Sequence, residues 1–411
     1  MVFKQERFTN DFGTIADSVL EESLEYMVDH PLYLFIPATY DDAANSTVSD
    51  NIFDNIKRIQ GNNHPIDNIV VGLDAAPERK MFDEVKERLD DIPNSKVIWN
   101  DSPEIQALYE EFTEMGFPVK AGKGRNMWTG LGHRYMEDRN SSFLTHDCDI
   151  KPHCYDEKTI LSLVAPILHP AFGEQDFSKA YYTRITPSED GRMKLGGRAT
   201  RILVYPFLDA VKENYGDISK SILDYVDHLK SFKYPLAGEF AMRANIASNL
   251  SIQPDWGLEI GTLNSLFQTR YRLAQVHLGE YDHKHSPVSR SDPHRGLNKM
   301  AEEIVKTVFR KLYSLEEEKI TNPKLFRQMY YDYEKFSGEI LQKYKVLSAS
   351  NDWHYDEISE VEAKITFSEA IGRAYSAFVK EPEEVQPLPN WNQMSHDLRE
   401  RLVESVEKYN N

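Results

Sequence analysis

The chain has 411 residues, of which 40% are hydrophobic, 11% aromatic and 28% charged, so it is long and apolar enough to fold around a sizeable core. Its 66 acidic residues outnumber the 48 Lys and Arg residues, which gives a formal net charge of -18. This charge argues against a nucleic-acid or membrane-surface partner, because phosphate backbones and anionic lipids would be repelled at long range. It still allows a locally basic pocket for one small anion.

The two cysteines are too few for a disulfide framework, and no segment approaches the roughly 20 apolar residues that cross a bilayer. Residues 1–17 lack the apolar core of a signal peptide. We therefore expect a cytoplasmic protein.

The first half of the chain alternates short apolar runs with segments of helical length. The runs cover residues 32–36, 69–74, 97–99 and 142–146. Strands spaced in this way predict βαβ units and a mostly parallel sheet, that is, an α/β fold. Ligands bind beyond the carboxyl ends of such strands, where residues 37–39, Asp74 and residues 147–149 all fall.

The character of the chain changes near residue 301. Apolar residues then recur at helical spacing: Ile304, Val305, Val308, Phe309 and Leu312, and later Leu398, Leu402 and Val406. We expect a first domain of residues 1–300 and a helical C-terminal region of residues 301–411. The latter would pack on the first domain or on a second subunit, which makes a homodimer plausible.

The motif Asp147-Cys148-Asp149 follows the fourth predicted strand, so its two carboxylates are expected on one side and Cys148 on the other. Two oxygen donors on one side suit a divalent cation such as Mg²⁺ or Mn²⁺ that also holds substrate phosphates. A polar strand exit is the common alternative, and the position at the ligand-binding rim favours the metal. A rival zinc site would draw on nearby softer ligands: His146, Cys148, His153 and Cys154. Their spacing fits no familiar zinc pattern, so we do not expect zinc.

Two glycine-bearing segments are candidate anion sites. Gly122-Lys123-Gly124 precedes a helical stretch, so its backbone N–H groups and Lys123 could approach a phosphate, although it is not a P-loop. In the segment 195–201, alternation would place Arg198 and Thr200 on one side, beside glycines that expose N–H groups. These donors suit a carboxylate or phosphate. A hairpin with a surface arginine fits equally well.

Three further segments place polar groups near glycines or each other. Pro235-Leu236-Ala237-Gly238-Glu239 and Gly257-Leu258-Glu259-Ile260-Gly261 each carry an acid that either caps a helix or faces a substrate. In an extended 281–285 segment, His283 and His285 would share a side, and either could complete a metal site with Asp149.

Taken in order, these motifs resemble the glucosyl-3-phosphoglycerate synthases of glycosyltransferase family 81, over about residues 30–290. The segments 235–239 and 257–261, with Leu278-Gly279 leading to His283, carry most of the resemblance. Segment 122–124 with Trp128, and segment 197–200, fall in the same order. The resemblance implies a retaining, metal-dependent enzyme with a GT-A, Rossmann-like fold. Its reaction would move glucose from an NDP-glucose, UDP-glucose foremost, to 3-phosphoglycerate, and its product would feed synthesis of the compatible solute glucosylglycerate.

The resemblance also implies a role for individual residues. The nucleotide would be bound by Pro37, Thr39, Asp41, Asp74, Lys123, Asp147 and Cys148. The metal would be held by Asp149 and His283, the acceptor by Gly197, Arg198, Thr200 and His285, and the donor sugar by Gly238, Glu239 and Glu259. Asp149, Glu259 and His283 would form the catalytic set. The chain departs from the family pattern at Ala75 (usually Ser), Asp41 (usually Glu) and His285 (where an acceptor-binding Asn is usual).

Other functions remain as alternatives. The nearest are a mannosyl-3-phosphoglycerate synthase or a glucosylglycerate synthase on the same fold. A non-catalytic sugar-nucleotide-binding protein is a second class, although the joint presence of Asp147, Asp149, His283 and Lys123 argues against it. A metal-dependent phosphohydrolase would need a cluster of several His and Asp ligands, which the sequence does not show.

Overall fold

A computed structural model describes residues 8–61, 66–117, 119–283, 295–381 and 387–410. Within these residues nine strands form one sheet in the order β1-β9-β6-β8-β5-β2-β3-β4, with β7 beside β6. The strands are β1 (Asn10–Asp11), β2 (Leu32–Thr39), β3 (Asn68–Asp74), β4 (Ser95–Trp99), β5 (Ser142–Thr145), β6 (Phe177–Pro187), β7 (Met193–Leu195), β8 (Phe240–Met242) and β9 (Leu273–Tyr281). The four runs predicted from the sequence correspond to β2, β3, β4 and β5.

The sheet is mostly parallel, as predicted. β2 pairs in parallel with β3 and β5, and β3 with β4, whereas β8 runs antiparallel between β5 and β6. Alternate side chains enter opposite layers: Tyr33 and Phe35 of β2 join one buried cluster, and Leu34 and Ile36 join the other. Both faces are therefore covered, and the central strands read as continuous apolar runs.

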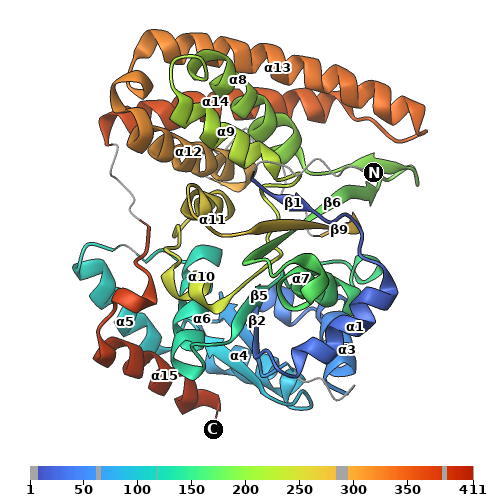
Figure 1. Cartoon of the computed structure of the whole chain (residues 1–411), viewed down its shortest axis with the longest axis vertical. Helices are drawn as coiled ribbons and strands as arrows, with labels where there is room; N and C mark the ends of the chain where they lie inside the picture. Colours follow the sequence, from blue (N-terminus) through green and yellow to red (C-terminus); the bar gives the residue numbers. More distant parts are fainter. Residues whose placement is uncertain (1–7, 62–65, 118, 284–294, 382–386, 411) are drawn as a thin grey trace.

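Helices cover both faces of the sheet (Figure 1). Those up to residue 300 are α1 (Asp17–Met27), α2 (Tyr40–Ala43), α3 (Ser46–Gly61), α4 (Arg79–Leu89), α5 (Pro103–Glu114), α6 (Lys123–Glu137), α7 (Glu157–Leu168), α8 (Tyr205–Tyr215), α9 (Lys220–Ser231), α10 (Ala244–Asn249) and α11 (Leu258–Leu266). The later ones are α12 (Gly296–Ile320), α13 (Pro323–Ser350), α14 (Glu357–Lys380) and α15 (His396–Asn410). None of these helices is both long enough and apolar enough to cross a membrane.

A helical lobe stands above the sheet in Figure 1, where α8, α9, α12, α13 and α14 gather at one end of the molecule. Its core joins residues from both sides of position 300, for example Phe207 of α8 against Phe309 of α12. Helix α15 lies at the other end, where it packs on α5, α6 and β4. The proposed domain division at residue 300 stays a prediction.

The segment after β7 differs from its predicted conformation. Gly197 has φ +69, and the chain then turns directly into the π-helix η3 (Ala199–Val204), which continues as α8. The expected strand-like alternation of Arg198 and Thr200 is therefore wrong. A left-handed glycine followed by a helix brings both residues to one surface by a different route.

Candidate active site

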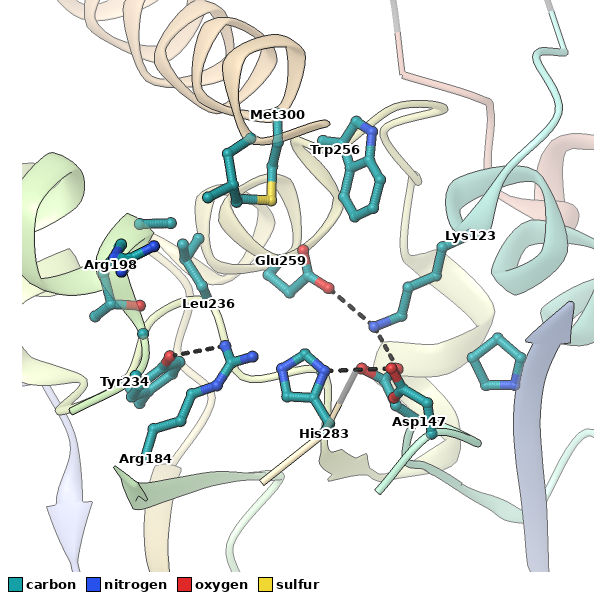
Figure 2. A pocket seen from close by; sticks show the side chains of 18 of the residues that line it. Lys123, Asp147, Arg184, Arg198, Tyr234, Leu236, Trp256, Glu259, His283 and Met300 are labelled. Atoms are coloured by element: carbon teal, nitrogen blue, oxygen red, sulfur yellow. Dashed lines mark hydrogen bonds and ion pairs between the residues drawn. The ribbon is translucent and has the colours of Figure 1, made fainter. Parts of the chain in front are cut away.

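A pocket of about 590 Å³ opens at the carboxyl ends of β2, β3 and β5. The helical lobe closes its other side through Leu297, Met300 and Ile304 of α12. Most of the site residues predicted from the sequence line it: Pro37, Thr39, Asp74, Lys123, Asp147, Cys148, Asp149, Gly197, Arg198, Thr200, Gly238, Glu259 and His283. Residues as far apart in the chain as Pro37 and Ile304 thus share one cavity, which Figure 2 shows from close by.

Three predicted residues do not line the pocket in this way. Asp41 is exposed on α2, and its neighbour Asp42 lines the pocket instead. Glu239 is fully buried, where it accepts a hydrogen bond from the hydroxyl of Tyr281. His285 lies outside the described residues.

Asp149 and His283 form a pair suited to a divalent cation. An antiparallel bridge between Ile150 and His283 brings the two segments together, and His283 Nδ1 lies 3.3 Å from Asp149 Oδ2. Both side chains are partly exposed to the pocket, at 22% and 23%. One carboxylate and one imidazole leave most coordination positions open, as expected for Mg²⁺ or Mn²⁺ that takes its other ligands from phosphates and water. The residues present therefore fit the metal.

Lys123, at the start of α6, is the central cation of the pocket. Its Nζ lies 2.6 Å from Asp147 Oδ1 and 3.1 Å from Glu259 Oε1, as Figure 2 shows. Burial lowers the pKa of Lys123, but the attraction of Asp147 and Glu259 outweighs it and raises the pKa, so the amine stays charged. A Cβ on Gly238 would lie 2.5 Å from this Nζ. Any larger residue at position 238 would therefore clash with the ion pair of Lys123 and Asp147.

Where the end of β3 meets α6, the pocket offers buried acceptors that have no donors among the described residues. Asp74 pairs with Arg125, yet its Oδ2 is buried and has no hydrogen-bond partner in the described structure. Asn126 donates to the backbone carbonyl of Gly72 at 2.6 Å, and its Oδ1 is likewise buried without a partner. Buried polar atoms are normally paired, so these two indicate a ligand with N–H or O–H donors.

Donor affinity should depend on the charge of Asp74. Burial raises the pKa of Asp74 to about 6, against the opposing effect of Arg125; Asp101 and Tyr109 also face it. Because only the ionised carboxylate accepts with both oxygens, affinity for the nucleotide sugar that the motifs predict should rise with pH until about pH 6 and level off above it. Titration calorimetry from pH 5 to 8 would measure this. In Asp74→Asn the step should disappear; an unchanged step would assign it to another group.

At the other end, Arg198 is held by the helical lobe. Its Nε lies 3.0 Å from Oε1 of the buried Glu360 on α14, and Arg201 binds the same carboxylate at 2.8 and 2.9 Å. Two guanidinium groups against one carboxylate leave a net positive charge beside the pocket. Since Glu360 occupies Nε, the terminal nitrogens of Arg198 stay available to an anion. Thr200 Oγ1 is buried nearby without a partner in the described structure.

The Glu360→Gln variant should bind less well the anionic acceptor that the motifs predict. Loss of the charge loosens Arg198, so we expect the acceptor KM to rise about tenfold, while the donor KM stays nearly constant. Steady-state kinetics with each substrate varied in turn would check this. Glu302→Gln is the matched control, because Glu302 also joins two helices of the lobe, pairing with Lys306 at 3.0 Å and Arg373 at 3.1 Å, away from this pocket. An equal rise of the acceptor KM in both variants would indicate that Glu360 only stabilises the fold.

Several pocket residues were not predicted from the sequence: Asn126, Tyr182, Arg184, Tyr234 and Trp256. Trp256 directly precedes the glycine-bearing segment 257–261, and the alternation of Tyr182, Arg184 and Thr186 in β6 was a usable signal. No sequence signal pointed to Glu360, because it acts through Arg198 from a helix 162 positions away.

Two other groups of possible metal ligands contain side chains that already have protein partners. His146 uses both ring nitrogens in the protein, towards the Asp147 carbonyl at 3.0 Å and the Tyr155 hydroxyl at 2.9 Å. In the described residues, a His133–Glu137–Glu407 group lies outside the pocket. Lys96 already pairs with its two carboxylates, at 3.0 and 2.6 Å.

The fold, with a pocket at the carboxyl ends of its parallel strands, defines the class: a GT-A nucleotide-sugar transferase. No family model matches the chain. The glucosyl-3-phosphoglycerate synthase of Persephonella marina is 34% identical over 402 residues, 95% of this chain and 94% of that protein. The enzyme of the same name from Methanococcoides burtonii is 28% identical over 98% of this chain and 97% of its own length. The chain belongs to the glucosyl-3-phosphoglycerate synthase family.

Solved structures agree with this fold. The glucosyl-3-phosphoglycerate synthase of Mycobacterium tuberculosis with Mn²⁺, UDP-glucose and phosphoglyceric acid gives a TM-score of 0.51 at 20% identity, over 74% of this chain and 87% of that one. Its complex with Mn²⁺, UDP and phosphoglyceric acid gives 0.51 at 19% identity, over 75% and 86%. The family resemblance and the GT-A fold predicted from the motifs are confirmed.

Proposed function

We propose that this chain transfers glucose from UDP-glucose to 3-phosphoglycerate in a Mg²⁺- or Mn²⁺-dependent reaction. One observation carries the proposal: a single pocket joins the metal pair of Asp149 and His283 to the positively charged Arg198. The first suits a nucleotide diphosphate and the second an anionic acceptor. The names of the relatives support the same donor and acceptor.

Each end of the pocket has a separate task in this reaction. Asp74 and Asn126 would accept hydrogen bonds from the nucleoside, and Lys123 would stay against the diphosphate as its negative charge grows. The cation, when bound, would neutralise part of the charge on the departing UDP. Arg198 and Thr200 would hold the acceptor, so that its hydroxyl meets the sugar between the two ends.

Retention by attack on the front face is the stereochemical course we infer. A double displacement would need a free carboxylate at the anomeric carbon. Glu259 and Asp147 both pair with Lys123, at 3.1 and 2.6 Å, which makes them poor nucleophiles. A phosphate oxygen of the leaving group would then take the proton of the acceptor hydroxyl.

A donor and acceptor screen tests the function. UDP-glucose, ADP-glucose, GDP-glucose and GDP-mannose would each be offered with 3-phosphoglycerate and with glycerate, and the products identified by mass spectrometry. We expect the fastest transfer from UDP-glucose to 3-phosphoglycerate. Preference for GDP-mannose or for glycerate would favour the related synthases on the same fold, and binding without any transfer would favour a sugar-nucleotide-binding protein.

A homodimer is the assembly that the helical lobe supports. Tyr331, Val346 and Ile358 on α13 and α14 are 74%, 66% and 75% exposed, and large apolar side chains gathered on one lobe favour an interface. Light scattering should give about twice the 47.6 kDa of one chain. The monomer mass would contradict the dimer.

The two cysteines are free thiols, which supports the expected cytoplasmic location.

A further inference from the structure

Arg184 is a pocket-lining cation to which neither the motifs nor the proposed function gives a task. It lies on β6 between Tyr182 and Thr186, and these alternate residues all face the pocket. In the parallel register with β9, Arg184 is opposite Tyr281, two residues before His283. Arg184 therefore stands beside the strand that delivers the metal-binding imidazole.

The charge of Arg184 is not balanced by the protein residues that the structure describes. Lys123 pairs with Asp147 and Glu259, and Arg198 pairs with Glu360. Arg184, by contrast, makes only a 3.5 Å hydrogen bond to the hydroxyl of Tyr234, and its Nε is buried without a partner. A partly buried guanidinium whose Nε is buried in this state is costly unless an anion joins it, so a ligand is its natural counter-ion.

The side chain of Arg184 has little freedom to turn away. A Cβ on Gly196 would lie 3.0 Å from Arg184 Cγ, so the arginine stem packs directly on the loop of residues 196–198. Figure 2 shows its guanidinium directed into the pocket, bonded to Tyr234. The same Tyr234 hydroxyl would lie 2.7 Å from a Cβ on Gly197, which connects Arg184 to that loop a second time.

The acceptor of the proposed function carries two anions at different distances from the reacting hydroxyl. In 3-phosphoglycerate the carboxylate is bonded to the carbon that bears this hydroxyl, whereas the phosphorus is three bonds away from that carbon. The carboxylate must therefore lie nearer to the donor and its metal. Arg184 is the cation on the strand next to His283, and Arg198 belongs to the loop on the lobe side.

We propose that Arg184 binds the carboxylate of the acceptor, while Arg198, Thr200 and the backbone of Gly197 bind its phosphate. This inference rests on the proposed function and adds the residue that recognises a glycerate rather than a glycerol. Arg184 would make a charge-assisted, two-point contact with the planar carboxylate. It would also fix the carbon that bears the reacting hydroxyl.

Two phosphate acceptors that differ at the carboxylate provide the test. The dissociation constants of 3-phosphoglycerate and of glycerol 3-phosphate, which has a CH₂OH group instead, would be measured by calorimetry on the full chain with Mg²⁺ and UDP. We expect the wild type to prefer 3-phosphoglycerate by about 10- to 100-fold. In Arg184→Met this preference should fall to within about threefold, and Arg184→Lys should restore part of it.

Arg198→Ala is the matched control, because it should weaken both ligands to a similar extent and keep their ratio. An Arg184→Met variant that keeps the wild-type ratio, or that weakens both ligands equally, overturns the carboxylate assignment. A selective loss of UDP affinity would place Arg184 at the diphosphate instead. A wild type that binds neither acceptor would count against the proposed function itself. Arg184→Gln, which keeps most of the stem, separates loss of charge from loss of packing.

Discussion

The Asp149→Ala variant should lose turnover by about 1,000-fold or more while keeping its fold. Asp149 supplies the only carboxylate of the metal pair at 3.3 Å from His283, so its removal leaves a single imidazole to hold the cation on the diphosphate. The rate of glucosyl transfer at saturating Mg²⁺ and the melting temperature would be measured together. Mn²⁺ binding in the presence of UDP, followed by electron paramagnetic resonance, gives a readout that does not depend on activity.

Asp91→Ala is the control for Asp149, because Asp91 is exposed and its one ion pair among the described residues is a 3.9 Å contact with Lys57. It should behave as wild type. Full activity in Asp149→Ala would refute the metal assignment. A variant that loses activity but binds Mn²⁺ and UDP normally would move Asp149 from metal binding to another task.

The Lys123→Met variant is the second change with a large expected effect. It removes the cation that lies 2.6 Å from Asp147 and 3.1 Å from Glu259, so two unbalanced carboxylates would face the incoming diphosphate. We expect kcat/KM for UDP-glucose to fall by about 100- to 1,000-fold, with weaker donor binding as part of the loss. Steady-state kinetics and UDP calorimetry would separate these two contributions.

Lys120→Met is the matched control, since Lys120 is exposed three positions earlier and does not line the pocket. In Lys123→Met/Glu259→Gln, part of the donor affinity should return, because one of the two repelling charges is gone. A Lys123→Met variant with unchanged donor affinity would show that its positive charge does not act on the diphosphate.

The sheet was predictable because local pattern determines it. Four apolar runs, separated by segments of helical length, define β2 to β5. Because the carboxyl ends of parallel strands meet at one edge of the sheet, Asp74 and Asp149 were correctly expected beside a common pocket. The sequence offered His283 and His285 equally as partners of Asp149, and only the family resemblance selected His283, because a bridge between segments more than 130 positions apart leaves no local signal.

The remainder of the site depends on packing that no single segment encodes. Glu239 and Gly238 were both predicted to face the sugar, yet Glu239 is buried against Tyr281, and Gly238 makes room for the pair of Lys123 and Asp147. Arg184 and Glu360 are important because of their surroundings: Glu360 pairs with Arg198, whereas the buried Nε of Arg184 has no hydrogen-bond partner among the described residues. Such relations appear only once the helical lobe and the sheet are placed together.

The most direct test of the central claim is a crystal structure with Mn²⁺, UDP and 3-phosphoglycerate. The account predicts an anomalous manganese peak within coordination distance of Asp149 and His283 and in contact with the diphosphate, with the acceptor phosphate at Arg198. A manganese peak elsewhere, for example between His133 and Glu407, or an acceptor bound outside this pocket, would contradict it.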